Sequence, residues 1–132
     1  MHFILNLMQS IRLAMFIYNY NRGLVSGLSI IKLEIFIPKS HLNILRDALR
    51  SVDAGAIGNY DSVLSYSTVH GNWRPLPGAN PYDGEIGVLC EAEEYKVEVC
   101  CQAEKLVQTI VAIKAIHPYE EPVINAIPLV SV

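Results

Sequence analysis

Two segments with the same internal order, an alternating stretch followed by a helical repeat, constrain this chain most strongly. In residues 31–37 every second residue is a large aliphatic one, which is the period of a half-buried β-strand. Pro38 ends this strand because proline cannot donate to a sheet ladder. Residues 41–52 then place apolar side chains at helical spacing, after Ser40, whose hydroxyl can cap a helix. We expect Gly55 to end the helix region in a left-handed conformation.

A second strand closes the first half of the chain, and the second half repeats the order of strand, helix and strand. Residues 60–68 predict a second strand, and residues 95–101 predict a third strand that alternates like the first. Between them, residues 69–91 are dense in glycine, proline and asparagine, which predicts a long loop of functional or contact type. Residues 103–116 predict a second helix, and residues 122–129 predict a last extended segment near a sheet edge.

The resulting order, β-α-β-β-α-β, defines an expected fold class. Two such halves build an α+β ferredoxin-like sandwich, a four-stranded antiparallel sheet with both helices on one face. The opposite face would carry apolar and charged side chains together: Phe36, Cys100, Glu34, Lys96 and Glu98. A face that is half apolar is expected to pack against another copy or another domain.

Charge is distributed unevenly along the 132 residues. Residues 1–30 contain two arginines and no acid, whereas residues 31–132 contain all 13 acidic residues. We therefore expect an acidic domain over residues 31–132 and an N-terminal extension, residues 1–30, outside the fold. A membrane-surface or targeting segment and an integral part of the fold are the alternatives for the extension. An acidic domain lacks the clustered Lys and Arg of nucleic-acid binding, and the two arginines interrupt any membrane span.

The three cysteines, Cys90, Cys100 and Cys101, form a poor disulfide framework because their number is odd and two are adjacent. In a strand, Cys100 and Cys101 point to opposite faces and cannot share a bridge. We interpret these two as small apolar residues in a reducing compartment, and we therefore expect a cytoplasmic protein.

The sharpest local motif is His-Pro-Tyr-Glu-Glu-Pro, residues 117–122. An imidazole and carboxylates are suitable ligands for first-row metals, so His117, Glu120 and Glu121 are candidate ligands of a divalent metal ion. Adjacent glutamates in an extended chain point in opposite directions, so further ligands would have to come from elsewhere. The alternative is structural, because a histidine at a helix C-terminus can bond a terminal carbonyl.

Other candidates for ligand or interface contacts lie in turns and in the long loop. Trp73 and Arg74 are of the types that anchor interfaces, although they could equally pin the loop to its own domain. The full set of ligand or interface candidates is Asn59, Tyr60, Trp73, Arg74, Asn80 and Tyr119. The sequence contains no P-loop, dinucleotide fingerprint, nucleophile elbow or zinc-finger cysteine pair, so no catalytic set is expected.

Taken in order, several motifs resemble the insert domain of Nif-three-like (YqfO-type) proteins over residues 31–129. These are Gly-Asn-Tyr-Asp at 58–61, Ser-Tyr-Ser-Thr at 65–68, Trp-Arg-Pro at 73–75, Gly-Ala-Asn-Pro at 78–81, Gly-Glu-Ile-Gly at 84–87 and His-Pro-Tyr-Glu-Glu-Pro at 117–122. The His-Pro-Tyr-Glu portion is also similar to the CutA divalent-cation-tolerance family.

This resemblance implies a PII-like and CutA-like fold and a homo-oligomer, with a trimer favoured. Full-length Nif-three-like proteins carry a two-metal centre in the domains that flank the insert, so neither that centre nor a hydrolase activity is transferred to this chain. We therefore expect a stand-alone insert that acts as a small non-catalytic binding or regulatory module. The alternative is a divalent-metal-binding protein, similar to CutA, that uses the motif at 117–122.

Overall fold

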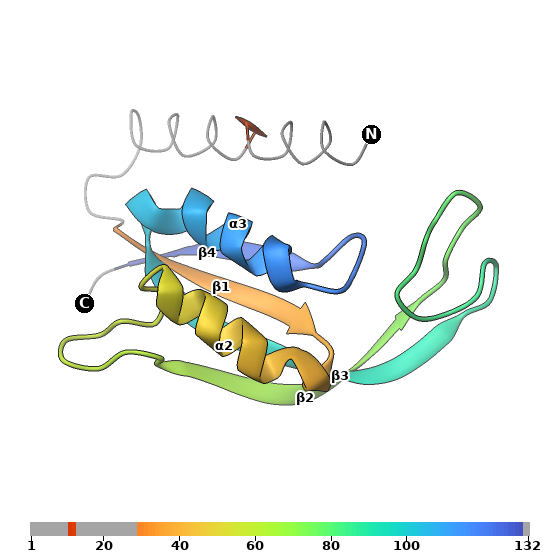
Figure 1. The fold of residues 1–132 in the computed structure, drawn as a ribbon, viewed down its shortest axis with the longest axis horizontal. Helices are drawn as coiled ribbons and strands as arrows, with labels where there is room; N and C mark the ends of the chain where they lie inside the picture. Colours follow the sequence, from red (N-terminus) through yellow and green to blue (C-terminus); the bar gives the residue numbers. More distant parts are fainter. Residues whose placement is uncertain (1–10, 13–28, 131–132) are drawn as a thin grey trace.

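The computed structural model describes residues 11–12 and 29–130. The described elements, in chain order, are β1 (Ile30–Ile37), η1 (Lys39–His41), α2 (Leu42–Ser51), β2 (Leu64–Trp73), β3 (Cys90–Gln102), η2 (Ala103–Lys105), α3 (Leu106–Ile116) and β4 (Ile124–Leu129). Two short 3-10 turns, η1 and η2, each lead directly into an α-helix. Figure 1 displays this arrangement, with both helices crossing the sheet.

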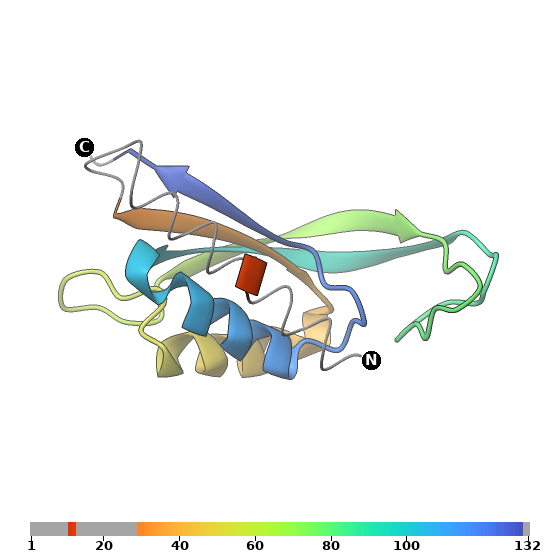
Figure 2. The ribbon, with the colours of Figure 1, turned by 90° about the horizontal axis from the view of Figure 1, so that it is seen from above.

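The four strands form one antiparallel sheet in the order β2-β3-β1-β4. Both α-helices cover the same face of this sheet, which is visible in Figure 2. The predicted ferredoxin-like α+β fold is therefore confirmed. The alternating strands β1 and β3 take the central positions, where both edges are paired.

The core lies between the helices and the sheet. Alternation in β1 places Leu33, Ile35 and Ile37 inward, and each is fully buried. Leu45 from α2 and Ile113 from α3 are buried against them. The amphipathic spacing recognised in the sequence is thus the cause of the helix packing.

The β2–β3 hairpin is longer than the sequence predicted. The prediction of a strand over residues 60–68 and a loop over residues 69–91 was wrong in its boundaries, because Trp73 still pairs with Cys90. The end of β1, Ile37, lies opposite Tyr95, so the outer part of the hairpin extends beyond the rest of the sheet (Figure 1). Ladder pairing with β3 overrides the turn preference of glycine and asparagine in this stretch.

The connection after α2 also differs from the prediction. The helix ends at Ser51, and Asp53 is the first left-handed residue, with φ 59°. Gly55 does adopt the expected left-handed conformation, with φ 81°, and its amide donates to the carbonyl of Cys100 at 2.8 Å. Ser40 does not cap the helix. It lies inside η1, and its hydroxyl oxygen is 2.9 Å from Nδ1 of His41.

The face of the sheet away from the helices carries a compact set of alternating charges, which we call the charge quartet: Lys32, Glu34, Lys96 and Glu98. Lys32 contacts Glu98 at 2.6 Å, and Lys96 contacts Glu34 at 2.8 Å. The side chain of Glu34 is only 14% exposed. Half-buried Phe36 and Cys100 border the quartet on this face, as predicted.

The three cysteines are free, with Cys101 in the core and Cys100 on the opposite face. Ser29 and Ile30 belong to the domain, since the carbonyl of Ser29 accepts a bond from the amide of Ala103 at 2.8 Å. The prediction that residues 1–30 form an extension falls almost wholly outside the described residues, and it stays a prediction. Within residues 11–12 and 29–130, no helix is long and apolar enough to cross a membrane.

Candidate functional site

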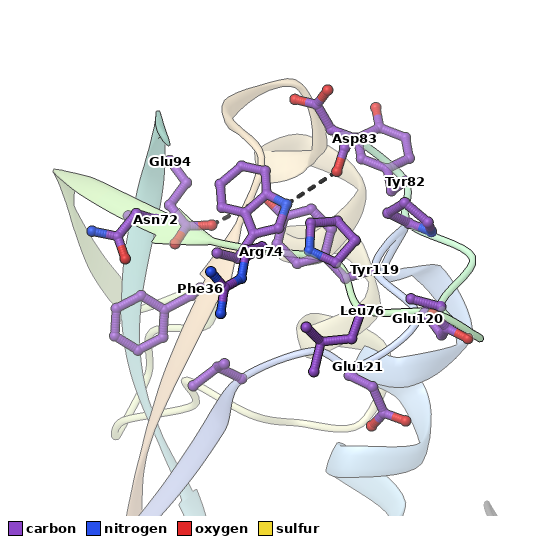
Figure 3. A pocket seen from close by; sticks show the side chains of 16 residues that line it. Phe36, Asn72, Arg74, Leu76, Tyr82, Asp83, Glu94, Tyr119, Glu120 and Glu121 are labelled. Atoms are coloured by element: carbon purple, nitrogen blue, oxygen red, sulfur yellow. Dashed lines mark hydrogen bonds between the residues drawn. The ribbon is translucent and has the colours of Figure 1, made fainter. Parts of the chain in front are cut away.

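The loop between β2 and β3 folds back toward the segment that precedes β4, and the two enclose a pocket of about 480 Å³. Figure 3 displays the side chains around it. The walls come from the end of β1, the outer hairpin, the loop and residues 119–123. The lining residues are Phe36, Gly71, Asn72, Trp73, Arg74, Pro75, Leu76, Ala79, Pro81, Tyr82, Asp83, Glu94, Tyr119, Glu120, Glu121 and Val123.

Trp73 fixes the shape of the loop. Its indole N–H donates to the backbone carbonyl of Asp83 at 3.0 Å, the bond drawn in Figure 3. Gly84 allows this approach, because a Cβ there would lie 3.2 Å from the indole nitrogen and 2.6 Å from the sulfur of Cys90. The sequence left two roles open for Trp73, an interface anchor and a contact that holds the loop to its own domain. The hydrogen bond to Asp83 is a contact of the second kind.

Tyr119 connects the loop to the sheet. Its hydroxyl donates to Glu94 at 3.1 Å, and its ring lies between the rings of Tyr82 and His117, with centroids 5.9 and 4.9 Å away. Burial, together with the negative charge of Glu94 and the hydrogen bond to it, raises the pKa of Tyr119 well above its ordinary value. The phenol therefore stays protonated at neutral pH and acts as a hydrogen-bond donor.

His117 is buried beside the pocket and uses both ring nitrogens. Nε2 donates to the carbonyl oxygen of Phe36 at 2.7 Å, and Nδ1 accepts from the amide of Tyr119 at 3.2 Å. This pairing requires the neutral ring with its proton on Nε2. Burial lowers the pKa of His117, against the opposing effect of the Phe36 carbonyl. The role of the ring is structural, but its partner differs from the expected one: it bonds a carbonyl of β1 and not a terminal carbonyl of the helix.

The two glutamates of the motif have different surroundings. Glu120 accepts a hydrogen bond from the backbone amide of Asn80 at 2.9 Å and so helps to close the loop, whereas Glu121 is exposed on the pocket rim. Among residues 11–12 and 29–130, no three His, Cys, Asp or Glu side chains gather as a metal site would require. The metal assignment to His117, Glu120 and Glu121 stays a prediction, and binding there would have to release existing hydrogen bonds.

The predicted ligand or interface residues fall into two groups. Trp73, Arg74 and Tyr119 line the pocket, and Asn80 contributes its backbone amide to the loop closure. Asn59 and Tyr60 lie elsewhere, in a tight turn where the amide of each of Ile57 and Tyr60 bonds the other's carbonyl at 2.9 Å. Tyr60 is 75% exposed.

Sequence reasoning missed several lining residues, among them Phe36, Tyr82, Asp83 and Glu94. Glu94 belongs to an alternating strand and Phe36 to the open sheet face, so neither has a local signal of a site. Tyr82 offers a weak signal, since it is an aromatic residue inside a segment that is otherwise rich in turn formers. Only the fold-back of the loop brings Tyr82 and Tyr119 together.

The fold is that of a CutA-like and PII-like ferredoxin-fold domain. The solved structure of the periplasmic divalent cation tolerance protein CutA from Archaeoglobus fulgidus superposes with a TM-score of 0.56 at 19% identity, covering 76% of this chain and 83% of that one. GlnK from B. subtilis superposes with a TM-score of 0.53 at 16% identity, covering 76% and 85% of the respective chains. These similarities establish the fold alone.

The sequence matches no family model, but its relatives place it more closely. A Bacillus cereus protein related to NIF3 has a TM-score of 0.68 at 30% identity, covering 81% of this chain and 27% of its own. Proteins named GTP cyclohydrolase 1 type 2 homolog are 36% identical over 103 residues in Halalkalibacterium halodurans and 34% identical over 98 residues in Bacillus subtilis. The domain is therefore a homologue of one segment of the Nif-three-like proteins, as the motifs predicted.

The similarity extends over most of this chain but over only a small part of the curated relatives. The alignments cover 78% and 74% of this chain but only 28% and 26% of the two curated relatives. The chain thus spans about a quarter of the length of these relatives. The similarity therefore relates this domain to one segment of those proteins.

Proposed function

We propose that this domain is a non-catalytic, oligomeric binding or regulatory module whose ligand site is the pocket beneath the β2–β3 loop. The observation that carries the proposal is the pocket itself, whose volume of about 480 Å³ is that of a small-molecule site. Its walls combine aromatic rings with a few charged groups, the usual make-up of a ligand site. Two segments distant in sequence, the loop and residues 119–123, contribute to it.

The chemistry of the lining favours binding over catalysis. The described residues around the pocket include no His, Cys, Ser or Lys, and its carboxylates, those of Asp83, Glu94, Glu120 and Glu121, have no such nucleophile beside them in the lining. Tyr119 has a raised pKa and donates to Glu94. His117 is not a lining residue, and its ring is held by the backbone groups of Phe36 and Tyr119. These contacts hold the side chains in position without activating any of them.

The open face of the sheet supports the oligomeric part of the proposal. The charge quartet occupies its centre with two positive and two negative groups, so its burial against a second copy leaves no net charge uncompensated. Phe36, Cys100 and Ile127 add apolar surface around it. We propose assembly through this face, as a trimer on the basis of the family resemblance, in the cytoplasm, where free cysteines stay reduced.

The ligand site can be tested with the single tryptophan of the chain, because Trp73 lines the pocket. A compound library is screened by Trp73 emission, and each hit is repeated on a Leu76→Arg variant, in which a long side chain fills the pocket. Leu89→Arg is the matched control, since Leu89 is 67% exposed on the same loop, against 60% for Leu76, but lies outside the lining. We expect hits that Leu76→Arg abolishes and Leu89→Arg retains. The absence of saturable hits, or hits equally retained by both variants, would refute the ligand site.

The oligomer is tested separately by light scattering over a range of protein concentrations. The proposal expects a mass that is a whole multiple of the chain mass and that persists on dilution. A mass of one chain at every concentration would remove the oligomeric part and leave the ligand site to be judged by the fluorescence screen.

A further inference from the structure

The pocket beneath the loop is walled by aromatic rings. Phe36, Trp73, Tyr82 and Tyr119 all line it, and the centroids of Tyr82 and Tyr119 are 5.9 Å apart. The faces of such rings carry partial negative charge, and they attract a cation within about 6 Å of the ring centroid. Several rings around one cavity are the arrangement that recognises organic ammonium groups in general.

The charged groups of the lining add to this preference. Four carboxylates, those of Asp83, Glu94, Glu120 and Glu121, border the pocket, and Arg74 is the only lining cation. Within the described part of the chain, none of these five side chains takes part in an ion pair: the ion pairs there join other residues. The lining therefore has an excess of negative charge that a bound cation would neutralise and a bound anion would increase.

Glu94 is the carboxylate best placed to act on a ligand. It is half-buried at the wall, and one of its oxygens accepts the hydroxyl of Tyr119 at 3.1 Å. Glu120 is already engaged with the amide of Asn80, and Glu121 is on the exposed rim. A positive group near Glu94 would meet the carboxylate and the Tyr119 ring together.

The size of the pocket fits an organic occupant better than a bare metal ion. A volume of about 480 Å³ matches an organic molecule or a long side chain. The described residues also do not gather the ligand set that a metal ion needs. The geometry points to an organic cation with an apolar body as the ligand of this pocket. This inference rests on the proposed function and names the chemical class of its ligand.

Two sources could supply that chemistry: a free amine or quaternary ammonium compound, and a basic side chain of a partner protein. Both present a positive group on an apolar stem. One small ammonium compound and one arginine derivative are therefore both needed as probes.

The direct test is a set of titrations of the full chain followed by Trp73 emission. The probes are benzyltrimethylammonium, its neutral analogue benzyl alcohol and its anionic analogue benzoate, which share one aromatic ring and differ in charge. We expect a saturable change with the cation, no saturation with benzoate over the same range, and weaker binding of the cation as salt concentration rises. N-acetylarginine methylamide is the probe for a protein side chain, and tighter binding of this probe than of benzyltrimethylammonium assigns the site to a partner protein.

Two variants test whether the change in Trp73 emission depends on Glu94 and Tyr82. Glu94→Gln keeps the shape and the hydrogen-bond acceptor but removes the charge, and we expect affinity for the cation to fall about tenfold. Tyr82→Leu removes one ring and is expected to weaken binding by roughly 3- to 30-fold. Glu91→Gln is the matched control, on the same strand but outside the lining, and it should leave affinity unchanged.

The outcomes separate this inference from the proposed function. If benzoate or benzyl alcohol binds as tightly as the cation, or if Glu94→Gln binds the cation as well as the unmodified chain does, the inference is overturned while the pocket remains a ligand site. If no probe and no library compound changes Trp73 emission, both the inference and the ligand site fail.

Discussion

Nε2 of His117 donates to the carbonyl oxygen of Phe36 over 2.7 Å, and this bond ties the segment before β4 to the end of β1. On the other side of the ring, Nδ1 accepts a hydrogen bond from the amide of Tyr119, so the imidazole joins two backbone positions, Phe36 and Tyr119. The wall of the pocket that contains Tyr119 therefore depends on a neutral, buried histidine.

We predict that His117→Ala lowers the free energy of unfolding by about 1–3 kcal/mol, because it leaves a half-buried carbonyl and an amide without partners. Urea denaturation measures the loss. His70→Ala is the control, since that side chain is 68% exposed. Equal stabilities of the two variants would contradict the positioning role of His117.

The same variant tests the metal alternative. Since both nitrogens of His117 are already engaged, we expect zinc or copper to bind the unmodified chain and His117→Ala with the same affinity, as measured by calorimetry. A clear loss of affinity in His117→Ala, reproduced by Glu120→Gln, would instead support the divalent-metal function.

Stability is expected to fall as the pH decreases below about 6.5. Burial lowers the pKa of His117 from its ordinary value of 6.5, so in this range the unfolded chain binds a proton that the folded chain does not. The stabilisation is complete above the unfolded pKa and is lost as the pH falls toward the folded one. The carbonyl of Phe36 opposes this shift, and the nearby His41 adds to it.

Urea midpoints at about pH 7.5 and about pH 5.5 measure this effect. Glu34 and Glu93 also have lowered pKa values, but their titration from an ordinary value of 4.5 is confined to more acidic solutions. The decrease in midpoint should be smaller in His117→Asn. A midpoint that stays constant or rises toward pH 5.5 would show that His117 is not buried as a neutral ring.

Gly55 should tolerate no side chain. Its φ is 81°, and a Cβ there would lie 2.7 Å from the backbone oxygen of Val63, which cannot move freely. Gly78 has a comparable φ of 98° with nothing within 4 Å of the added atom. Alanine at Gly78 therefore measures backbone strain alone, of about 1 kcal/mol. We expect Gly55→Ala to cost clearly more in thermal denaturation, and equal costs would argue against the close packing of this connection.

The charge quartet offers a test of the interface by exchange of charges. We expect Glu34→Lys to dissociate the oligomer, because three lysines would then surround Glu98 on the face proposed to be buried. The double variant Glu34→Lys with Lys96→Glu restores alternating pairs and should recover the mass seen by light scattering. Asp47→Lys, on the exposed side of α2, is the control. An unchanged mass in Glu34→Lys would exclude this face.

Much of the fold could be predicted because its signals are local. The alternation of Leu33, Ile35 and Ile37 and the helical spacing that includes Leu45 each record a face that turns toward the core. The outer hairpin could not be predicted in the same way. Gly71 is turn-prone in isolation, and only pairing across from Ala92 makes it part of a strand.

The candidate site was predicted in part for the same reason. The motifs that contain Trp73 and Tyr119 attract attention because of their residue types, and both lie at the pocket. The contact of Tyr119 with Glu94 joins positions 25 residues apart, and that of Asn80 with Glu120 joins positions 40 apart. Such contacts join segments that are distant in the sequence, and no local pattern records them. The turn at Asn59, although it belongs to a motif of the family resemblance, does not reach the pocket.

The most direct test of the account is mass spectrometry under non-denaturing conditions on the protein purified from its host without exchange of metals. An oligomeric binding module predicts a whole multiple of the chain mass, three on the basis of the resemblance, that also retains a small organic cation. Tyr82→Leu should lose the retained mass and keep the oligomer. A mass of one chain with nothing bound would contradict the account.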